Sequence, residues 1–228
     1  MRDYVKYKNE LNTVSLGTFN ANEFNLFFSL LSRTKEEQHE QIYLKWDDLK
    51  DLAHYTSTSN TRFLKDLNSM YQKLTDTNYL HMYTDDNQVG LERFMIFEDF
   101  TFLEKDKAIQ ARFNPKFTCL LNQVHANATC FSLEEFISLK KKYAKNLYRL
   151  LKQAEKRGYW EVSFENLTFL LGVPKNYQVG QIDQKILKPS IEELSKYFRH
   201  LTVEKKYSKT QGNKVLGYMF KFDSFRQT

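Results

Sequence analysis

The sequence predicts an α+β protein in which one small domain occurs twice in tandem. Two observations support this fold class. Apolar positions of the first half recur in the second half 118 to 124 residues later, and each half closes with two strands joined by a turn. A recurrence of this kind indicates two copies of one structural unit. The 228 residues are enough for two domains of about 100 residues each.

Each half begins with a predicted helix that carries the same start signal. Asn20 precedes Glu23 by three residues, and Ser132 precedes Glu135 by the same spacing, which is the signature of a capping box. The second of these helices is expected to continue to Gly158, because glycine commonly ends helices. The matching apolar positions are Phe27, Leu30 and Leu31 in the first half and Leu147, Leu150 and Leu151 in the second.

A short extended stretch and a short helix follow in each half, and then a longer helix. Residues 42–55 and 159–173 have the same apolar pattern, and the second copy ends at Gly172. The longer helix of the second copy is predicted at 181–198, where Pro189 is expected to kink or shorten it. The matching apolar positions of the two longer helices are Phe63, Leu67, Met70 and Leu74, and Leu187, Ile191, Leu194 and Phe198.

Each copy closes with a predicted β-hairpin. Residues 79–97 contain two strand patterns around an Asn/Gly-containing turn, and residues 200–222 contain two around Gly212 and Asn213. Alternation in the last strand predicts that one face is buried. The residues expected on that face are Leu216, Tyr218, Phe220 and Phe222. The order helix, strand, helix, helix, strand, wing, strand predicts a tandem duplication of a winged helix-turn-helix domain.

The predicted boundaries are an N-terminal winged-helix domain at 1–115, a connecting segment at 116–132 and a C-terminal winged-helix domain at 133–228. Residues 1–114 hold 14 Lys and Arg against 18 Asp and Glu, a net charge of −4. Residues 115–228 hold 20 against 10, a net charge of +10. This asymmetry favours a polyanionic partner for the second domain.

The two predicted wings also differ in charge. The tip of the first holds Asp85 and Asp86. The lysines of the second are Lys205, Lys206, Lys209 and Lys214. Lysines on a wing contact DNA phosphates, which supplies affinity and salt dependence without sequence choice. The alternative for each lysine taken alone is a solvated edge without a ligand.

The helix predicted at 181–198 carries residue types that read bases. The second helix of a helix-turn-helix enters the major groove by its N-terminal residues, where Gln pairs with adenine and Lys donates to guanine. The candidate DNA-contacting residues of this helix are Gln181, Gln184, Lys185 and Lys188. The equivalent residues of the first copy are Asn60, Thr61, Arg62 and Lys65. A weaker second DNA contact and a protein-binding face are both open for the first copy.

Several stretches of the chain resemble one family. VKYKNELN at 5–12 and the helix EFNLFFSLLSRTKE after it are similar to the start of the two-winged-helix replication initiators of theta-replicating plasmids, the RepA/RepB type. LKKKYAKNLYRLLKQ at 139–153, EVSFENLTFLLGV, Tyr177 and KILKPSIEELSKYF at 185–198 are similar to its second domain.

The resemblance implies a sequence-specific DNA-binding initiator of plasmid replication. Its monomers would bind directly repeated origin sites, or iterons, with both domains, and bend and help to melt the origin. Dimers formed through the N-terminal domain, in equilibrium with the monomers, would repress the protein's own promoter. Double-stranded DNA and host replication proteins are the partners that the resemblance implies.

No motif predicts catalysis, a cofactor or a metal. Rolling-circle initiators cut DNA with a tyrosine beside a metal held by a His-x-His motif, and none of the five histidines stands in such a pair. A phosphate-binding G-x-x-x-x-G-K-[ST] loop is also absent. Cys119, His125 and Cys130 do not match zinc-site spacing, so both cysteines are expected to pack in the protein. The protein is therefore predicted not to be an enzyme.

Two alternative functions remain open from the residues. One is a winged-helix transcriptional repressor without an origin role, which would use the same domains. The other is a nuclease or recombinase whose nucleophile is one of the 14 tyrosines. The charged N-terminus, the lack of any run near the ~18 apolar residues of a spanning helix and the two cysteines lead us to expect a cytoplasmic protein without a membrane partner.

Overall fold

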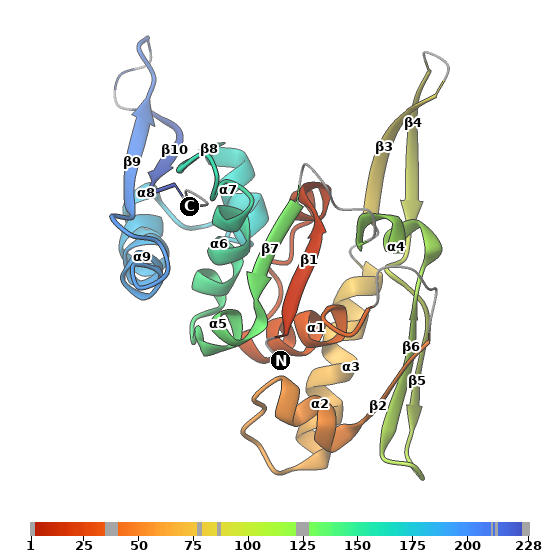
Figure 1. Ribbon diagram of the computed structural model, residues 1–228. Coiled ribbons are helices and arrows are strands. Elements are labelled where there is room, and N and C mark those ends of the chain that lie inside the picture. The colour runs from red at the N-terminus through yellow and green to blue at the C-terminus, as the bar shows by residue number, and fades with distance from the viewer. Residues whose placement is uncertain are drawn as a thin grey trace. The chain divides into compact units, whose positions relative to one another are not determined.

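The computed structural model arranges the chain as two units, each with its own helices and three-stranded sheet (Figure 1). It describes residues 3–34, 41–76, 79–85, 88–121, 128–210, 212 and 214–224, apart from the side chains of 79–93 and of residue 119. Unit 1 comprises Met1–Val14 and Phe19–Ile137, and unit 2 comprises Ser15–Thr18 and Ser138–Thr228. The observed boundaries differ from the predicted ones, and four residues near the N-terminus belong to unit 2.

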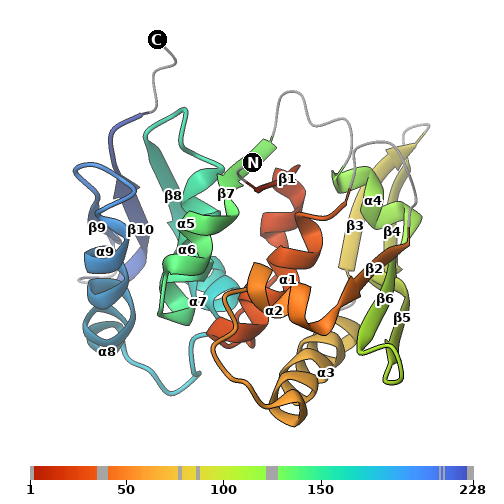
Figure 2. The same cartoon turned by 60° about the horizontal axis from the view of Figure 1, so that its bottom comes forward.

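Unit 1 contains a winged helix with additional elements before and after it. Its helices in the described part of the chain are the 3-10 helix η1 (Asn9–Thr13), α1 (Ala21–Leu31), α2 (Trp46–Leu52), α3 (Asn60–Asp76), α4 (Pro115–Leu121) and α5 (Leu133–Ser138). Its strands there are β1 (Tyr4–Lys8), β2 (Ile42–Lys45), β3 (Tyr79–Asp85), β4 (Gln88–Phe94), β5 (Phe97–Leu103), β6 (Ala108–Phe113) and β7 (Ala128–Ser132). Figure 2 shows β2, β6 and β5 as neighbouring strands, in that order.

Unit 2 repeats the order that the winged helix of unit 1 has in α1, β2, α2, α3, β5 and β6. Its helices in the described part are α6 (Lys142–Lys152), α7 (Phe164–Leu171), α8 (Val179–Ile182), the π-helical turn η2 (Asp183–Leu187) and α9 (Lys188–Leu194). Its strands there are β8 (Tyr159–Ser163), β9 (Thr202–Tyr207) and β10 (Val215–Lys221), in the sheet order β8-β10-β9. In both units the strand before the helix-turn-helix pairs with the last strand of its three-stranded sheet, β2 with β6 and β8 with β10, so the predicted duplication of a winged helix is confirmed.

The predicted connecting segment 116–132 is part of unit 1. It contains most of α4 and all of β7, and β7 pairs antiparallel with β1 (Figure 1). Phe131 of β7 and Tyr7 of β1 pack edge to face with ring centroids 6.2 Å apart. A strand pair of this kind leaves no local signal, because the partner lies far away in sequence.

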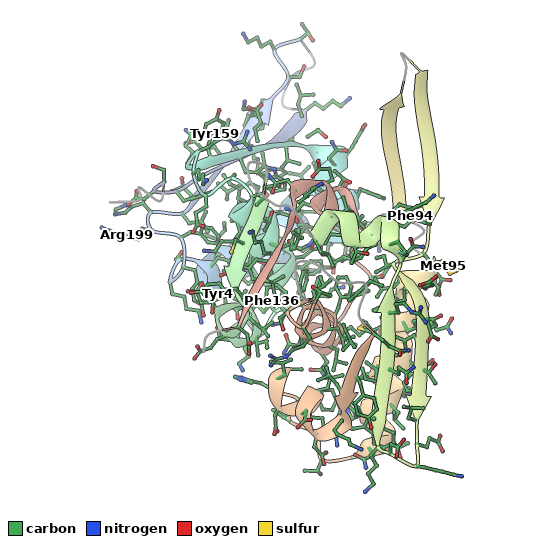
Figure 3. All side chains as sticks on the ribbon, turned by 45° about the vertical axis from the view of Figure 1, so that its right-hand side comes forward. Tyr4, Phe94, Met95, Phe136, Tyr159 and Arg199 are labelled. Atoms are coloured by element: carbon green, nitrogen blue, oxygen red, sulfur yellow. The ribbon has the colours of Figure 1, made fainter. Side chains whose placement is uncertain are left out.

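The predicted hairpin at 79–97 exists, but it is not the wing of unit 1. β3 and β4 pair with each other in a two-stranded sheet of their own, with Tyr79 opposite Phe94. The strands that complete the sheet with β2 are β5 and β6. Figure 3 labels Phe94 and Met95 at the point where the chain passes from β4 to β5.

The wing of unit 1 is therefore the turn between β5 and β6, at 104–107. The assignment of an acidic wing tip to Asp85 and Asp86 is wrong for this reason. The side chain of Asp85 and the whole of residue 86 lie outside the described residues. The actual turn holds two carboxylates and two lysines, namely Glu104, Lys105, Asp106 and Lys107.

The single helix predicted over 132–158 is two helices, α5 and α6. The backbone is extended at Lys141, directly before α6 begins. There the carboxylate of Glu193, in α9, accepts hydrogen bonds from the backbone N–H groups of Lys140 and Lys141. Because the break is satisfied by a side chain from a distant helix, the local apolar pattern continues through it.

The capping box predicted at the start of α1 is confirmed. Asn20 Oδ1 accepts a hydrogen bond from the backbone N–H of Glu23 at 2.9 Å, and Glu23 Oε2 accepts from the backbone N–H of Asn20 at 2.7 Å. Glu23 is fully buried, and its carboxylate also accepts from Ser69 Oγ at 2.6 Å and from Lys73 Nζ at 2.7 Å. This one carboxylate therefore ties the start of α1 to α3.

The longer helix of unit 2 runs from 179 to 194 instead of 181–198 and contains one π-helical turn. The backbone N–H of Lys188 donates to the carbonyl of Asp183, five residues earlier. Pro189 follows in the first turn of α9. Proline lacks an N–H and crowds the carbonyl four residues earlier, so a wider turn at this place lets the helix continue.

The core face of this helix differs in part from the predicted one. Leu187 and Leu194 are buried as predicted, and so is Phe198 after the end of the helix, whereas Ile191 is only half-buried. The π-helical turn shifts the register of the buried stripe, which gains Ile182 and Ile186. The helix still presents one apolar side to the core and one polar side to solvent.

The last strand buries the predicted face except at its start. Tyr218, Phe220 and Phe222 are buried, but Leu216 is 50% exposed. The pairing of β10 with β9 shifts register between Val215 and Gly217, which turns Leu216 away from the core. The alternation that predicts a buried Leu216 therefore holds only beyond this irregularity.

Residues 15–18 are fixed to unit 2 by a close approach of two glycines. Ser15 Oγ donates a hydrogen bond to the carbonyl of Phe169 at 2.6 Å. Gly172 caps α7 with a φ of 61°, in the left-handed region. A Cβ on Gly17 would lie 2.2 Å from the backbone nitrogen of Gly172, and a Cβ on Gly172 would lie 2.6 Å from the carbonyl carbon of Gly17. Both positions therefore require glycine.

The expectation that both cysteines pack in the core is wrong for Cys130. This residue is exposed in β7, because the alternation of the strand buries Thr129 and Phe131 instead. The side chain of Cys119 and residue His125 lie outside the described residues. Within the part of the chain that the structure describes, no helix has the length and apolar content needed to cross a bilayer.

Candidate nucleic-acid interface

The polar side of the helix over 179–194 is the first part of the candidate interface. The buried side fixes the rotation of this helix, because Ile182 and Ile186 face the core near its start. On the opposite side, Gln184, Lys185 and Lys188 are exposed, whereas Gln181 is half-buried. These four predicted DNA-contacting residues therefore differ in their surroundings.

Gln181 takes part in the capping of its own helix. Its Oε1 accepts a hydrogen bond from the backbone N–H of Gln178 at 2.9 Å. Bidentate recognition of adenine needs both the oxygen and the NH₂ group of one amide. Because the oxygen is used at the helix start, Gln181 is placed as a cap in this structure and is not arranged for base recognition.

Lys185 points toward the loop before the helix. Its Nζ lies 5.3 Å from the centroid of the Tyr177 ring, within the range of a cation–π interaction. The charge remains at the surface, because Lys185 is exposed. Lys185 and Tyr177 thus form one basic and aromatic corner beside the start of α8.

A groove of about 450 Å³ separates the helix from the wing strands. Gln184 and Lys188 border it from the helix, and Val203 borders it from β9. The other lining residues are Asp183, Leu187, Ile191, Glu192, Lys205 and Tyr218. Figure 1 shows the helix α9 beside the hairpin of β9 and β10. Two of the predicted base-contacting residues therefore face the side of the wing.

Asp183 connects the helix to the wing across this groove. Its Oδ2 lies 2.5 Å from Lys205 Nζ, and its Oδ1 accepts a hydrogen bond from the hydroxyl of Tyr218 at 3.0 Å. Lys205 in β9 and Tyr218 in β10 stand directly opposite each other in the sheet. The hydrogen bond to Asp183 raises the pKa of Lys205, and burial together with Asp183 raises the pKa of Tyr218.

The four wing lysines fall into two classes. Lys206 pairs with Glu161 of β8 on the face opposite to Lys205, so the two lysines inside β9 each have a carboxylate partner. Lys209 and Lys214 lie beyond the strands, where the backbone N–H of Ser208 donates to the carbonyl of Lys214 at 2.9 Å. Both are exposed at the tip. The predicted turn residue Asn213 lies outside the described residues.

The corresponding surface of unit 1 is less basic. Arg62 and Lys65 are exposed on α3 as the prediction requires. Asn60 is engaged, because its Oδ1 accepts a hydrogen bond from Lys50 Nζ at 2.6 Å. The wing turn at 104–107 has no net charge. Within the observed boundaries unit 1 holds 15 Lys and Arg against 20 Asp and Glu, whereas unit 2 holds 19 against 8.

Two residues of this region were missed by sequence reasoning. Asp183 was overlooked because it is an acid in a basic stretch, and its partners are distant in sequence. Lys145 is buried in α6, although lysine is usually exposed, and burial lowers its pKa to about 7. Its spacing from the buried Tyr148 and Arg149 is the local signal that it shares their side of the helix. Among the described residues, no cluster of three or more potential ligands could hold a metal ion.

A curated relative, a probable replication protein rep from Bifidobacterium longum (strain NCC 2705), is 29% identical over 223 residues, which cover 96% of this chain and 72% of the relative. Among solved structures, the Pi initiator protein in complex with iteron DNA matches with a TM-score of 0.71 and 16% identity, over 99% of each chain. At this identity the structural match supports the fold.

Two family models match the chain in succession. The model described as "Initiator Replication protein, WH1" matches residues 4–152, and the model described as "Initiator Rep protein, WH2" matches residues 163–222. Together they span both winged helices described above. The chain therefore belongs to the family of initiator replication proteins with two winged-helix domains.

Proposed function

We propose that this protein initiates plasmid replication by binding repeated DNA sites at the origin. Membership in the initiator family and the likeness to a structure solved with iteron DNA support the proposal. The observation within this chain that carries it is the helix and wing of unit 2. There exposed Gln184 and Lys188 border the groove beside the wing, and Lys209 and Lys214 lie exposed at the wing tip.

In the proposed complex, the helix over 179–194 lies in the major groove and the wing follows the adjacent backbone. Gln184 and Lys188 contact base edges, and Lys185 contacts the flanking backbone. Lys209 and Lys214 neutralise phosphates, which accounts for affinity but not for sequence choice.

The remaining partners of the proposal follow from the family resemblance. Monomers bind the origin repeats with both units, and unit 1 adds a weaker contact through Arg62 and Lys65 of α3. Dimers repress the protein's own promoter. Host replication proteins then join the bound origin, because no phosphate-binding loop for ATP-driven unwinding occurs in the sequence.

A footprint of the purified protein across the DNA that flanks its gene tests this function. The expected result is protection of several directly repeated sites, with weaker protection at the promoter. Protection of a single inverted repeat and of no direct repeats would instead identify a transcriptional repressor without an origin role. Incubation with supercoiled DNA and Mg²⁺ is expected to leave the DNA intact, and a nick or covalent adduct would indicate a nuclease.

Removal of the two tip lysines is expected to weaken binding to every duplex by a similar factor. In the double variant Lys209→Ala/Lys214→Ala, two phosphate contacts are lost, so the slope of log K against log salt concentration should become shallower by about 1.8. Fluorescence anisotropy with an origin duplex and a scrambled duplex at several salt concentrations measures both effects. The ratio of the two affinities should stay within about twofold of the wild-type ratio.

Two single variants complete this experiment. Lys156→Ala removes an exposed lysine at the other end of the sheet, where the carbonyl of Gly158 accepts from the backbone N–H of Phe222, and it should leave the slope unchanged. Gln184→Ala should cost about 1–3 kcal/mol at one base pair and leave the slope unchanged. Equal slopes for the double variant and Lys156→Ala would remove the wing tip from the interface.

A further inference from the structure

We propose that Asp183 is a specificity-determining residue of unit 2, which holds the wing against the DNA-reading helix and keeps Lys205 away from DNA phosphates. This inference rests on the proposed function. The role requires a negative charge that pairs with Lys205, which the basic residues around Asp183 cannot supply. Removal of the carboxylate should therefore strengthen binding to unrelated DNA and weaken discrimination.

The first part of the argument is the geometry of the carboxylate. Each oxygen of Asp183 has a separate partner, Lys205 Nζ at 2.5 Å for one and the Tyr218 hydroxyl at 3.0 Å for the other. These partners come from two strands and stand opposite each other in the sheet. A side chain held at two points by two strands fixes both the distance and the rotation between helix and hairpin.

The second part concerns what else supports the wing at this place. The groove between the helix and β9 is lined by the apolar side chains of Leu187, Ile191 and Val203, of which Ile191 and Val203 are only partly buried. An open groove of about 450 Å³ supplies little packing between helix and hairpin there. The polar link through Asp183 therefore has more influence on the wing position than it would in a filled interface.

The third part is the charge of Lys205. Its side chain is 31% exposed, and the side chain of the paired Asp183 is 23% exposed, so both remain close enough to solvent to meet DNA. The side chain of Lys206 points to the other face of the sheet, toward Glu161. Lys205 is thus the lysine of β9 that pairs with the helix, and its pairing with Asp183 reduces the basic charge beside the base-reading residues.

A fixed helix-to-wing distance favours the site whose groove and backbone match it. A non-specific duplex offers phosphates at many positions, so a freed lysine can reach one of them in any register. The pairing therefore reduces non-specific affinity more than specific affinity. Specificity depends on this difference between the two affinities.

The test compares four proteins with the origin duplex and a scrambled duplex by fluorescence anisotropy over a range of salt. They are the wild type, Asp183→Asn, Lys205→Met and the double variant. Asp183→Asn keeps an oxygen for the Tyr218 hydroxyl but loses the charge that holds Lys205. We expect its scrambled-duplex affinity to rise at least threefold, its salt slope to steepen by about 0.9 and its specificity ratio to fall at least threefold.

The two variants with Lys205→Met separate this role from a simple loss of charge. In the wild-type background the substitution should leave the salt slope unchanged, because Lys205 does not contact phosphate. In the Asp183→Asn background it should remove the added slope of about 0.9 and restore the wild-type value. Equal effects of Lys205→Met in both backgrounds would overturn the inference, as would an unchanged specificity ratio in Asp183→Asn.

The failure of the proposed function has a different signature in the same data. If the wild type does not prefer the origin duplex over the scrambled one, the origin-binding function itself is wrong. If the wild type prefers it and the variants do not differ, only the role of Asp183 is wrong. Thermal unfolding followed by the fluorescence of Trp160 in a Trp46→Phe background, since Trp160 lies in the same sheet, should show that all four proteins are folded at the temperature of the binding assay.

Discussion

Replacement of Glu23 by alanine is expected to lower the free energy of unfolding of unit 1 by about 3–4 kcal/mol. The substitution removes a fully buried carboxylate that accepts from Lys73, Ser69 and the backbone of Asn20. Removing one partner of a buried ion pair leaves the other without compensation, which costs about 3–5 kcal/mol, and loss of a cap adds about 1. Because the Lys73 side chain is 31% exposed and can reach water, the broken pair should cost only about 2–3 kcal/mol, which together with the cap gives a total of about 3–4 kcal/mol.

The two tryptophans of the chain allow this effect to be measured in one unit. Trp46 lies in unit 1 and Trp160 in unit 2, and both are buried. Urea unfolding followed by Trp46 in a Trp160→Phe background therefore reports unit 1. Glu23→Gln should cost about half as much, since it keeps the shape and one acceptor oxygen. Glu98→Ala, which breaks an exposed pair with Arg112, should change the free energy of unfolding by less than about 0.5 kcal/mol.

Replacement of Gly17 by alanine is expected to destabilise unit 2 by about 2–3 kcal/mol. The new Cβ would lie 2.2 Å from the backbone nitrogen of Gly172, and backbone atoms cannot move aside as a flexible side chain can. The segment then either strains or leaves its place. Leaving exposes the buried Leu16 and breaks the hydrogen bond from Ser15 to Phe169, which together limit the cost to about this value.

Unfolding followed by Trp160 in a Trp46→Phe background measures this second effect. The matched control is Gly180→Ala, because Gly180 is in α8, has no atom within 4 Å of an added Cβ and should be neutral or slightly stabilised by alanine. If Gly17→Ala and Gly180→Ala changed the free energy of unfolding by the same amount, Gly17 would not lie close to Gly172 in solution. A change confined to the Trp46 transition, measured in the Trp160→Phe background, would place the segment in unit 1.

The parts of the fold that depend on neighbouring residues could be predicted from the sequence. The capping box of Asn20 and Glu23 is local, and so is the apolar stripe of α3, whose Phe63, Leu67 and Met70 are all buried. The end of α7 is also predicted by a local signal, because Gly172 caps the helix. The close contact of Gly172 with Gly17, which also requires glycine, has no local signal. Local signals were sufficient to recognise the duplication.

The wing of unit 1 could not be chosen in the same way. The strands over 79–94 and those over 97–113 both form hairpins, and either could follow a helix-turn-helix. The choice depends on which strand pairs with β2, and Ile42 stands opposite Ala111. That pairing is a property of the folded unit, so the periodicity of either hairpin could not indicate it.

The candidate site shows the same limit. The four wing lysines have similar surroundings in the sequence, but Lys205 and Lys206 meet Asp183 and Glu161 only after the sheet and helix have formed. Likewise, the amide of Gln181 is used as a helix cap, which its spacing alone did not reveal. Residue type predicted where basic charge lies, and the fold determines which part of that charge can reach DNA.

Residues 15–18 belong to unit 2, although the residues before and after them belong to unit 1, and this affects how the protein folds during synthesis. The ribosome releases the N-terminal residues first, yet Tyr4 finds its strand partner at Ser132, and Gly17 meets its own only at Gly172. Unit 1 therefore cannot close before Ser132 has been synthesised, and residues 15–18 cannot take their place in unit 2 before Gly172 has been synthesised. Contacts between residues this far apart in sequence are typical of slowly folding proteins. We expect nascent chains of this protein to depend on chaperones until Gly172 has left the ribosome.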